Sequence, residues 1–265
     1  MDSKTSKANR PAVITPRIPE DIIDEILDHL AADSDFKSLR ACALLSRSWV
    51  PSSRRHLFHT VDLTWGKMDR WYNTFPVPEE SPAHHVLVLH ISNNAIDWVP
   101  VKFFDHAPRF TNVRKLFLFG GEHCAGPRVP SLWKLPESVT SLAISASNGA
   151  SLVKIWEIVA QLPNLDDLSL QGRFIQADRS ALLGIGTVPR GRFGGKLVLR
   201  NVYGAGRGHI EFLEILTGSP FSRVEIDYAR EYIPAVIRLV EACSQTIVKL
   251  SLNVRYSGKY HSSSS

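Results

Sequence analysis

The chain of 265 residues is poor in cysteine and has no long hydrophobic run. Its three cysteines (Cys42, Cys124 and Cys243) are odd in number and far apart, so they imply no disulfide framework and fit a reducing compartment. No stretch approaches the roughly 18 consecutive apolar residues of a membrane span. Residues 1–17 are polar and basic, which does not match a secretory signal. We therefore expect a cytoplasmic or nuclear protein without a membrane partner.

Signatures of catalysis, of nucleotide binding and of structural metal sites are missing as well. Gly191–Lys196 is not a phosphate loop, because Leu197 stands where Ser or Thr is needed, and the spacing of Gly204–Gly208 does not match a dinucleotide-binding turn. Glu122-His123-Cys124 lacks a second pair of metal ligands, and Asp166-Asp167 is not accompanied by a nucleophile motif. We expect a protein that is not an enzyme and that uses no cofactor or metal.

The chain does contain an internal repeat. A short apolar-x-apolar signature recurs at successive intervals of 28, 27, 26, 26, 29, 27 and 26 residues. Its occurrences are Val61–Leu63, Leu89–Ile91, Leu116–Leu118, Leu142–Ile144, Leu168–Leu170, Leu197–Leu199, Val224–Ile226 and Leu250–Leu252. Each signature predicts a short strand that buries two side chains and exposes the residue between them. The remaining residues of each unit must bring the chain back beside the previous strand.

Amphipathic stretches within the repeat units predict return helices at 151–162, 210–216 and 232–243. Stacked units of this kind form an α/β solenoid, with parallel strands on a concave face and helices on the convex side. The segments 112–118 and 162–170 resemble leucine-rich repeats of the long, helix-containing type, and the resemblance covers roughly residues 60–255. The asparagine position of that family is mostly absent. An ordinary α/β domain with parallel strands is the alternative.

Residues 18–60 lack the repeat and predict a helical module. Pro19 suits the first position of a helix whose apolar side chains share one arc, namely Ile22, Ile23, Ile26, Leu27 and Leu30. Asp33-Ser34-Asp35 offers an N-cap for a second helix that ends at Pro51 and carries Leu39, Cys42, Leu45 and Trp49 on one face. Ser52–Phe58 predicts a short third helix. So small a module needs a covering for its apolar surface, either the first repeat, which it would then cap, or another protein.

The amino-acid sequence of this module resembles the F-box motif. Ile18-Pro19-Glu20 matches its Leu-Pro-x-Glu start, Ile26-Leu27-Asp28-His29-Leu30 matches its centre, and Leu39–Trp49 matches its Cys- and Trp-containing end. The resemblance implies docking onto a Skp-type adaptor, and through it onto a cullin ubiquitin ligase, while the repeats choose the substrate. The residues that it implies for the adaptor interface are Pro19, Ile22, Ile23, Ile26, Leu27, Leu30, Leu39, Cys42, Leu45 and Trp49.

The substrate is expected on the concave face, where residues between and beside the buried strand positions point. Phe117 and Phe119 are candidate aromatic anchors, and Lys196, Arg200 and Arg223 would suit an acidic or phosphorylated segment. These cations belong in part to a basic region between Gly172 and Gly208, which carries seven basic residues against one acid. The alternative is that a loop covers Phe119 and that the cations are merely solvated.

The sequence thus predicts a disordered basic segment at 1–17, an F-box-like module at 18–60, a repeat solenoid at 61–256 and a disordered tail at 257–265. The expected function is substrate reception for a Skp–cullin–F-box type ubiquitin ligase. A repeat scaffold outside ubiquitination, or a nucleic-acid binder that uses the basic surface, is the alternative.

Overall fold

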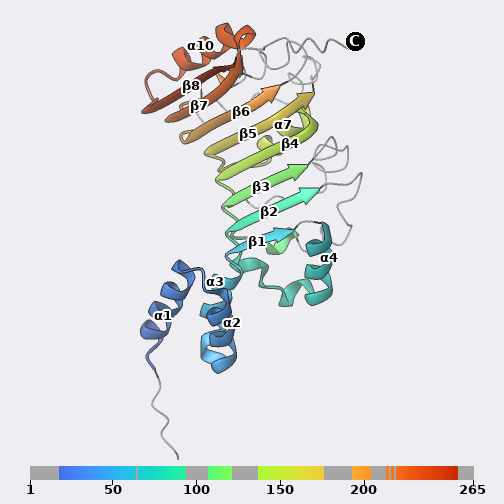
Figure 1. Ribbon diagram of the computed structural model, residues 1–265, viewed down its shortest axis with the longest axis vertical. Helices are drawn as coiled ribbons and strands as arrows, with labels where there is room; N and C mark the ends of the chain where they lie inside the picture. Colours follow the sequence, from blue (N-terminus) through green and yellow to red (C-terminus); the bar gives the residue numbers. More distant parts are fainter. Residues whose placement is uncertain are drawn as a thin grey trace, which may run out of the picture. The chain divides into compact units, whose positions relative to one another are not determined.

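The computed structural model describes residues 18–63, 65–93, 107–120, 137–175, 193–203, 213–214, 216–217 and 219–255. The predicted disordered segments, most of the predicted helix at 210–216 and much of the basic region lie outside these residues. The chain divides into two compact units, Met1–Leu57 and Phe58–Ser265. We call them the helical unit and the sheet unit and describe each by itself (Figure 1).

The described part of the sheet unit forms one eight-stranded sheet in which every strand pairs in parallel with its neighbours in the sequence, in the order β1 to β8 (Figure 1). The strands are β1 (Thr60–Leu63), β2 (Val88–Asn93), β3 (Lys115–Gly120), β4 (Ser141–Ser151), β5 (Asp167–Ile175), β6 (Lys196–Tyr203), β7 (Arg223–Ala229) and β8 (Lys249–Arg255). Each contains one predicted signature. The register aligns these signatures throughout, so that Val61 lies beside Leu89 and Leu89 beside Leu116. The predicted α/β repeat architecture is confirmed.

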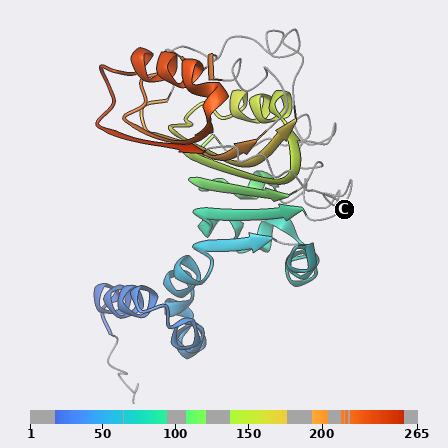
Figure 2. The ribbon, with the colours of Figure 1, turned by 45° about the horizontal axis from the view of Figure 1, so that its top comes forward.

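The hydrophobic core of the sheet unit lies on one face of the sheet. Both signature positions of β1 to β7 are buried, and helices α4 (Trp65–Thr74), α7 (Leu152–Ala160) and α10 (Ile233–Ala242) contribute buried side chains to the same core. Figure 2 shows α7 and α10 on one side of the strands. Two predicted return helices are confirmed as α7 and α10, whereas α4 was not foreseen. Short 3₁₀ turns also occur in the return segments: η2 (Pro78–Glu80) and η3 (Pro82–His85) follow α4, η4 (Ala107–Arg109) lies between β2 and β3, and η6 (Arg230–Tyr232) precedes α10.

A ladder of hydrogen bonds joins neighbouring repeats just before their strands. The carbonyl of His59 accepts from the backbone N–H groups of Leu87 and Val88, and the carbonyl of Leu87 does the same for the next repeat. Side chains reinforce this ladder, since the amides of Asn112 and Asn164 donate to carbonyls of the preceding repeat at 2.6 and 2.8 Å. These bonds satisfy loop carbonyls that would otherwise lie unpaired between repeats. The asparagine position of the leucine-rich-repeat family, by contrast, is mostly absent from the sequence.

Between β4 and β5 the register shifts, and Gly172 lies at the shift with a positive φ of 111°. A Cβ atom at this position would come within 1.9 Å of the carbonyl oxygen of Ala146. Glycine is therefore required here both for its backbone angle and for the space that it leaves.

The helical unit consists of α1 (Glu20–Ala32), α2 (Phe36–Leu45), the 3₁₀ turn η1 (Arg47–Trp49) and α3 (Val50–Leu57). Its core is small, comprising buried Ile23, Leu27, Leu39 and Cys42 with partly buried side chains around them. On the surface, Arg55 and His56 of α3 pair with Asp28 of α1 at 3.5 and 2.9 Å.

Several local predictions for this unit were confirmed or corrected. Asp35 caps α2 as expected: its carboxylate accepts hydrogen bonds from the hydroxyl of Ser38 and from the backbone N–H of Ser38 at 3.0 Å, and these bonds lower the pKa of the carboxyl. Pro19 is the N-cap of α1 instead of its first residue, because its ψ of 147° is not helical. The second helix ends at Leu45, so Trp49 lies in η1 and Pro51 lies in the first turn of α3, where a proline costs no hydrogen bond.

Candidate functional site

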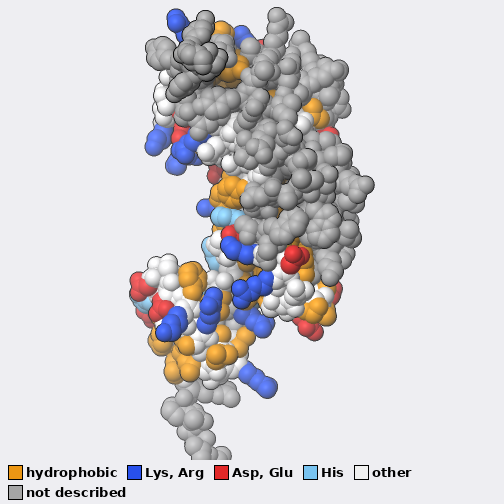
Figure 3. Space-filling view, turned by 45° about the vertical axis from the view of Figure 1, so that its right-hand side comes forward, with side chains coloured by type: hydrophobic (Ala, Val, Ile, Leu, Met, Phe, Trp, Pro, Cys, Tyr) orange, Lys and Arg blue, Asp and Glu red, His pale blue; other side chains and the backbone are white. Residues whose placement is uncertain are grey.

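The helical unit carries a set of exposed apolar side chains that its own helices leave uncovered. Its members, which we call the docking face, are Ile18, Ile22, Ile26, Phe36, Leu44 and Leu45. The exposed fraction is 42% for Ile22, 87% for Leu44 and 70% for Leu45. Figure 3 shows hydrophobic side chains gathered on the surface of this unit. Single exposed apolar residues are ordinary, but six on so short a segment make this unit a candidate interaction surface.

Helix geometry explains how α1 contributes to both the core and the docking face. Ile22 and Ile26 are four residues apart and so follow one line along the helix, while Ile23 and Leu27 follow the next line. The second line is turned into the core, where Leu27 has no exposed surface. The first line therefore stays in solvent. One continuous apolar arc in the sequence is split into a buried half and an exposed half.

The ten residues predicted for an adaptor interface fall into three classes in the structure. Ile23, Leu27, Leu39 and Cys42 are buried and hold the helices together, and Leu30 and Trp49 are partly buried against them. Pro19, Ile22, Ile26 and Leu45 are exposed. Leu45 was expected to share the buried face of Leu39, but α2 ends at this residue and its side chain is not packed against the other helices.

Three members of the docking face were not among those ten residues. Ile18 precedes the first helix, whereas Phe36 and Leu44 lie at opposite ends of α2. An apolar residue among polar neighbours was the signal in the sequence for Ile18 and Phe36, whereas Leu44 adjoins Ala43 and Leu45. These residues were not predicted for the adaptor interface, because the predicted apolar stripe of the second helix passed through Leu39 and Cys42.

In the sheet unit, the second candidate surface is the face of the sheet opposite the core helices, which we call the open face. The residue between the two buried positions of each strand lies on it, and the register aligns His90, Phe117, Ala143, Ser169, Val198, Glu225 and Ser251 in one row. A second row contains Phe119, Ser145, Gln171 and Arg200. Aromatic groups lie at one end of these rows, small side chains and Gln171 in the middle, and charged groups at the other end.

The aromatic end of the open face consists of His90, Phe117 and Phe119. The ring centroid of His90 is 4.4 Å from that of Phe117 and 5.9 Å from that of Phe119, and the two phenyl rings are nearly parallel. Phe119 remains 37% exposed. His90 and Phe117 are of intermediate exposure, so the three rings form a partly accessible platform, and the loop from residue 121 that was the alternative cover for Phe119 lies outside the described residues.

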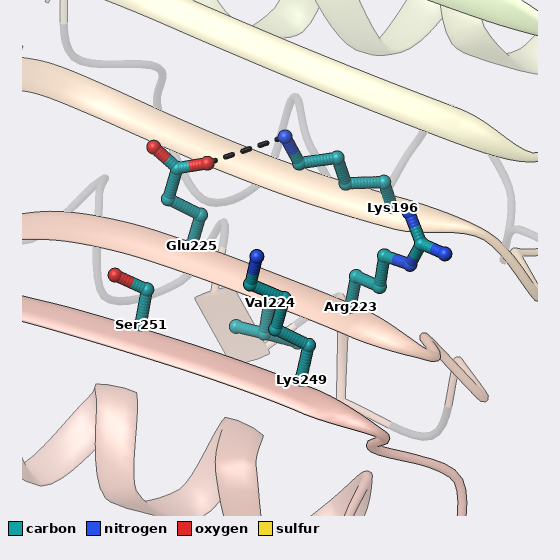
Figure 4. A pocket seen from close by; sticks show the side chains of 6 residues that line it. All are labelled: Lys196, Arg223, Val224, Glu225, Lys249 and Ser251. Carbon is teal, nitrogen blue, oxygen red and sulfur yellow. Dashed lines mark ion pairs between the residues drawn. The ribbon is translucent and has the colours of Figure 1, made fainter.

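The charged end forms a shallow pocket of about 80 Å³, lined by Lys196, Arg223, Val224, Glu225, Lys249 and Ser251. Lys196, Arg223 and Lys249 occupy one register position on the adjacent strands β6, β7 and β8. Figure 4 shows the three side chains extending over the same side of the sheet, with Glu225 turned toward Lys196. Like charges on neighbouring strands repel one another, so this arrangement lowers stability unless an anion compensates it.

Glu225 compensates only part of this charge. It pairs with Lys196 at 3.2 Å and accepts hydrogen bonds from the guanidinium of Arg200. The bonds from Arg200, followed by those from Lys196, hold the pKa of the Glu225 carboxyl below its ordinary value. Arg223 and Lys249 make no ion pair with any described residue. Of the three predicted cations, Lys196 and Arg200 thus share one carboxylate, whereas Arg223 has no ion pair with a described residue.

The glycine loop before β6 has a structural explanation. The backbone N–H of Gly194 donates to Asp166 at 2.8 Å, and that of Lys196 donates to Asp167 at 2.6 Å. These donors are engaged by carboxylates of the preceding repeat, which leaves them unavailable to a phosphate. Asp166 and Asp167 accordingly tie two repeats together.

The remaining features of the described residues concern metal ligands, membrane-spanning helices and thiols. Within the described ranges, no group of three His, Cys, Asp or Glu side chains is placed to hold a metal ion, while Glu122-His123-Cys124 lies outside them. No described helix has the length and apolar character needed to cross a bilayer. Cys42 and Cys243 are both free thiols.

Comparison with protein-family models and with curated proteins finds no significant match to this chain. The geometry of the two surfaces is therefore the basis for assigning a function.

Proposed function

We propose that the protein is a substrate-receptor subunit of a Skp–cullin–F-box type ubiquitin ligase. In this proposal the docking face binds the Skp-type adaptor and the open face binds the substrate. The main observation in support of this proposal is the docking face: its exposed apolar residues belong to a helical unit whose amino-acid sequence resembles the F-box motif.

The distribution of apolar side chains in the helical unit supports a partner. The buried residues already serve the unit's own core, so the docking face is not needed to hold the three helices together. Covering the exposed part of such a side chain is worth on the order of 1 kcal/mol. Six side chains covered together supply a substantial fraction of the free energy of a specific complex.

The sheet unit supports the receptor half of the proposal. Its open face presents an aromatic platform and a cationic pocket on rigid parallel strands. Residues placed on a regular sheet keep fixed distances from one another, which suits recognition of a protein segment. In this proposal ubiquitin transfer belongs to the other subunits of the ligase.

Co-purification of the full chain with a Skp-type adaptor tests the proposal. We expect a stable complex, and we expect the double variants Ile22→Ser/Ile26→Ser and Leu44→Ser/Leu45→Ser each to weaken it by roughly tenfold or more. Ile237→Ser is the matched control, because Ile237 is an exposed helical isoleucine of the sheet unit, with 49% of its surface exposed. It should bind the adaptor as the unmodified chain does.

Two results would count against the proposal. One is the absence of a complex under conditions in which an established F-box protein binds the adaptor. The other is a complex that both double variants leave unchanged, since the docking face would then have no part in it. In either case the chain is better described as a repeat scaffold outside ubiquitination.

A further inference from the structure

The open face differs from end to end, and the register fixes how far apart its two distinctive sites lie. The aromatic platform is on β2 and β3, whereas the uncompensated cations Arg223 and Lys249 are on β7 and β8. Neighbouring strands are spaced by about 4.8 Å, so β3 and β7 are roughly 19 Å apart across the sheet. An extended chain advances about 3.3–3.6 Å per residue and crosses that distance in about six residues.

Between these sites the first row of the open face carries short side chains, whereas the second row also carries Gln171 and Arg200. Ala143, Ser169 and Val198 continue the row of Phe117, and Ser145 continues the row of Phe119. None of these side chains is long enough to block a chain that runs across the strands. Their small size keeps this row low above the sheet, although Val198 is buried, and the serine hydroxyls can bond to a peptide backbone.

The cationic pocket determines the kind of group that it receives. Three cations and one carboxylate line it, and Ser251 adds a hydroxyl. Lys196 is already in an ion pair with Glu225. Among the described lining residues, the polar side chains left to bind a ligand are therefore those of Arg223, Lys249 and Ser251. A guanidinium, an ammonium and a hydroxyl together suit an anionic oxygen-rich group such as a phosphate or a carboxylate.

We infer that the open face binds one extended peptide segment at two points: an apolar side chain on the platform of His90, Phe117 and Phe119, and an anionic side chain about six residues away between Arg223 and Lys249. The inference rests on the proposed function in so far as this segment belongs to the ligase substrate. It moves the anionic contact away from Lys196 and Arg200, which the sequence had favoured. The anion is a phosphorylated serine or threonine, or an acidic residue.

Peptide binding to the purified full chain tests this inference. The probes are fluorescein-labelled 11-residue peptides of Gly and Ser that carry one Phe and one phosphoserine six positions apart, made in both orders. Matched peptides place the two residues only two positions apart, replace Phe by Gly, or replace phosphoserine by Glu or by Ser. We expect the six-residue phosphoserine peptide in one order to bind at least about tenfold more tightly than the Ser peptide and the short-spacing peptide. Comparison of the Glu and phosphoserine peptides then decides which anion is preferred.

Variants of the chain assign each contact. Arg223→Glu and Lys249→Glu should each weaken phosphoserine binding by roughly tenfold or more, since charge-assisted bonds are lost. Lys115→Glu is the matched control, because Lys115 occupies the same register position on β3, about 19 Å from β7 and beyond the screening length of physiological salt. Glu225→Gln should tighten binding several-fold, because it frees Lys196 and Arg200 for the anion.

A further variant separates the apolar contact from the anionic one. Phe119→Ala should weaken binding of the Phe peptide but leave binding of the Gly peptide unchanged. Thermal unfolding of each variant, compared with the unmodified chain, verifies that it remains folded.

Several results would overturn the inference. These are no binding by any peptide, binding that does not depend on the spacing, and binding that Arg223→Glu and Lys249→Glu leave intact. Another is tighter binding of single-stranded oligothymidine than of every peptide, lost in the same two variants, which would identify a nucleic-acid surface instead. All arms omit the adaptor, so their outcome is independent of whether the docking face binds it.

Discussion

The two units use the same kinds of apolar residues in different ways. In the sheet unit, both signature positions of every strand from β1 to β7 are buried, so the fold of the unit accounts for its apolar pattern. In the helical unit, Ile23 and Leu27 are buried while their neighbours Ile22 and Ile26 are exposed. The fold of the unit leaves the second pattern unexplained. This contrast is the physical basis of our proposal that the adaptor binds the helical unit and the substrate binds the sheet unit.

Within the sheet unit itself, the last strand departs from this rule. Leu250 and Leu252 of β8 occupy the same register positions as buried residues of β7, yet they are 44% and 42% exposed. Position in the repeat therefore predicts which way a side chain points. Burial also requires that neighbouring units cover it.

The largest expected effect sharpens the contrast between covered and uncovered repeats. Leu197→Ala removes a side chain with no exposed surface from the middle of the core, and it should lower the free energy of unfolding by about 2–5 kcal/mol. Leu250→Ala changes the aligned position of β8 and should cost less than about 1 kcal/mol. Urea denaturation of both variants measures the difference. Equal costs would mean that the two positions are equally covered in solution.

A smaller effect separates the two halves of α1. Leu27→Ala should destabilise the helical unit by about 2–3 kcal/mol, since it empties the centre of a small core. Ile26→Ala alters the adjacent exposed residue and should change stability by no more than about 0.5 kcal/mol. Hydrogen exchange of peptides from residues 20–57 reports on this unit alone. If Ile26→Ala proves as costly as Leu27→Ala, the docking face is part of the core and the contrast fails.

The smallest effect concerns the charged end of the open face. Because Arg200 and Lys196 lower the pKa of Glu225, the ionised carboxylate stabilises the folded state fully at pH values above the ordinary value of 4.5. This contribution is lost as the pH falls from there through the lowered pKa. Glu225→Gln should therefore cost less than about 1 kcal/mol at pH 7, as expected for an exposed ion pair, and nothing at pH values below the lowered pKa. Denaturant unfolding between pH 3 and pH 7 tests this, and a cost that does not change with pH would show that the ion pair contributes nothing.

The sequence predicted the sheet well, because a strand signature repeated at nearly constant spacing has few other structural solutions. It predicted α7 and α10 from their apolar stripes but missed α4, whose Trp71 and Tyr72 enter the core from a segment rich in polar residues. It also missed the loop ladder of Asn112 and Asn164, since a hydrogen bond to a carbonyl of the preceding repeat leaves no pattern within one repeat.

The candidate sites were less predictable for a different reason. An apolar stripe shows which residues avoid water, but it does not show which of them the unit itself will bury, as Ile22 and Ile23 demonstrate. Likewise, the sequence located Lys196, Arg200 and Arg223 but did not show that Glu225 engages the first two. Both distinctions depend on contacts between elements that are distant in sequence.

Hydrogen–deuterium exchange of the full chain with and without a Skp-type adaptor tests the central claim most directly. Adaptor binding at the docking face should slow exchange in peptides from residues 18–45 and leave the strands at 60–255 unchanged. The Ile22→Ser/Ile26→Ser variant should show no such protection, while Ile237→Ser should retain it. Protection confined to the sheet unit, or no protection at any adaptor concentration, would contradict the proposal that the helical unit is an adaptor-docking module.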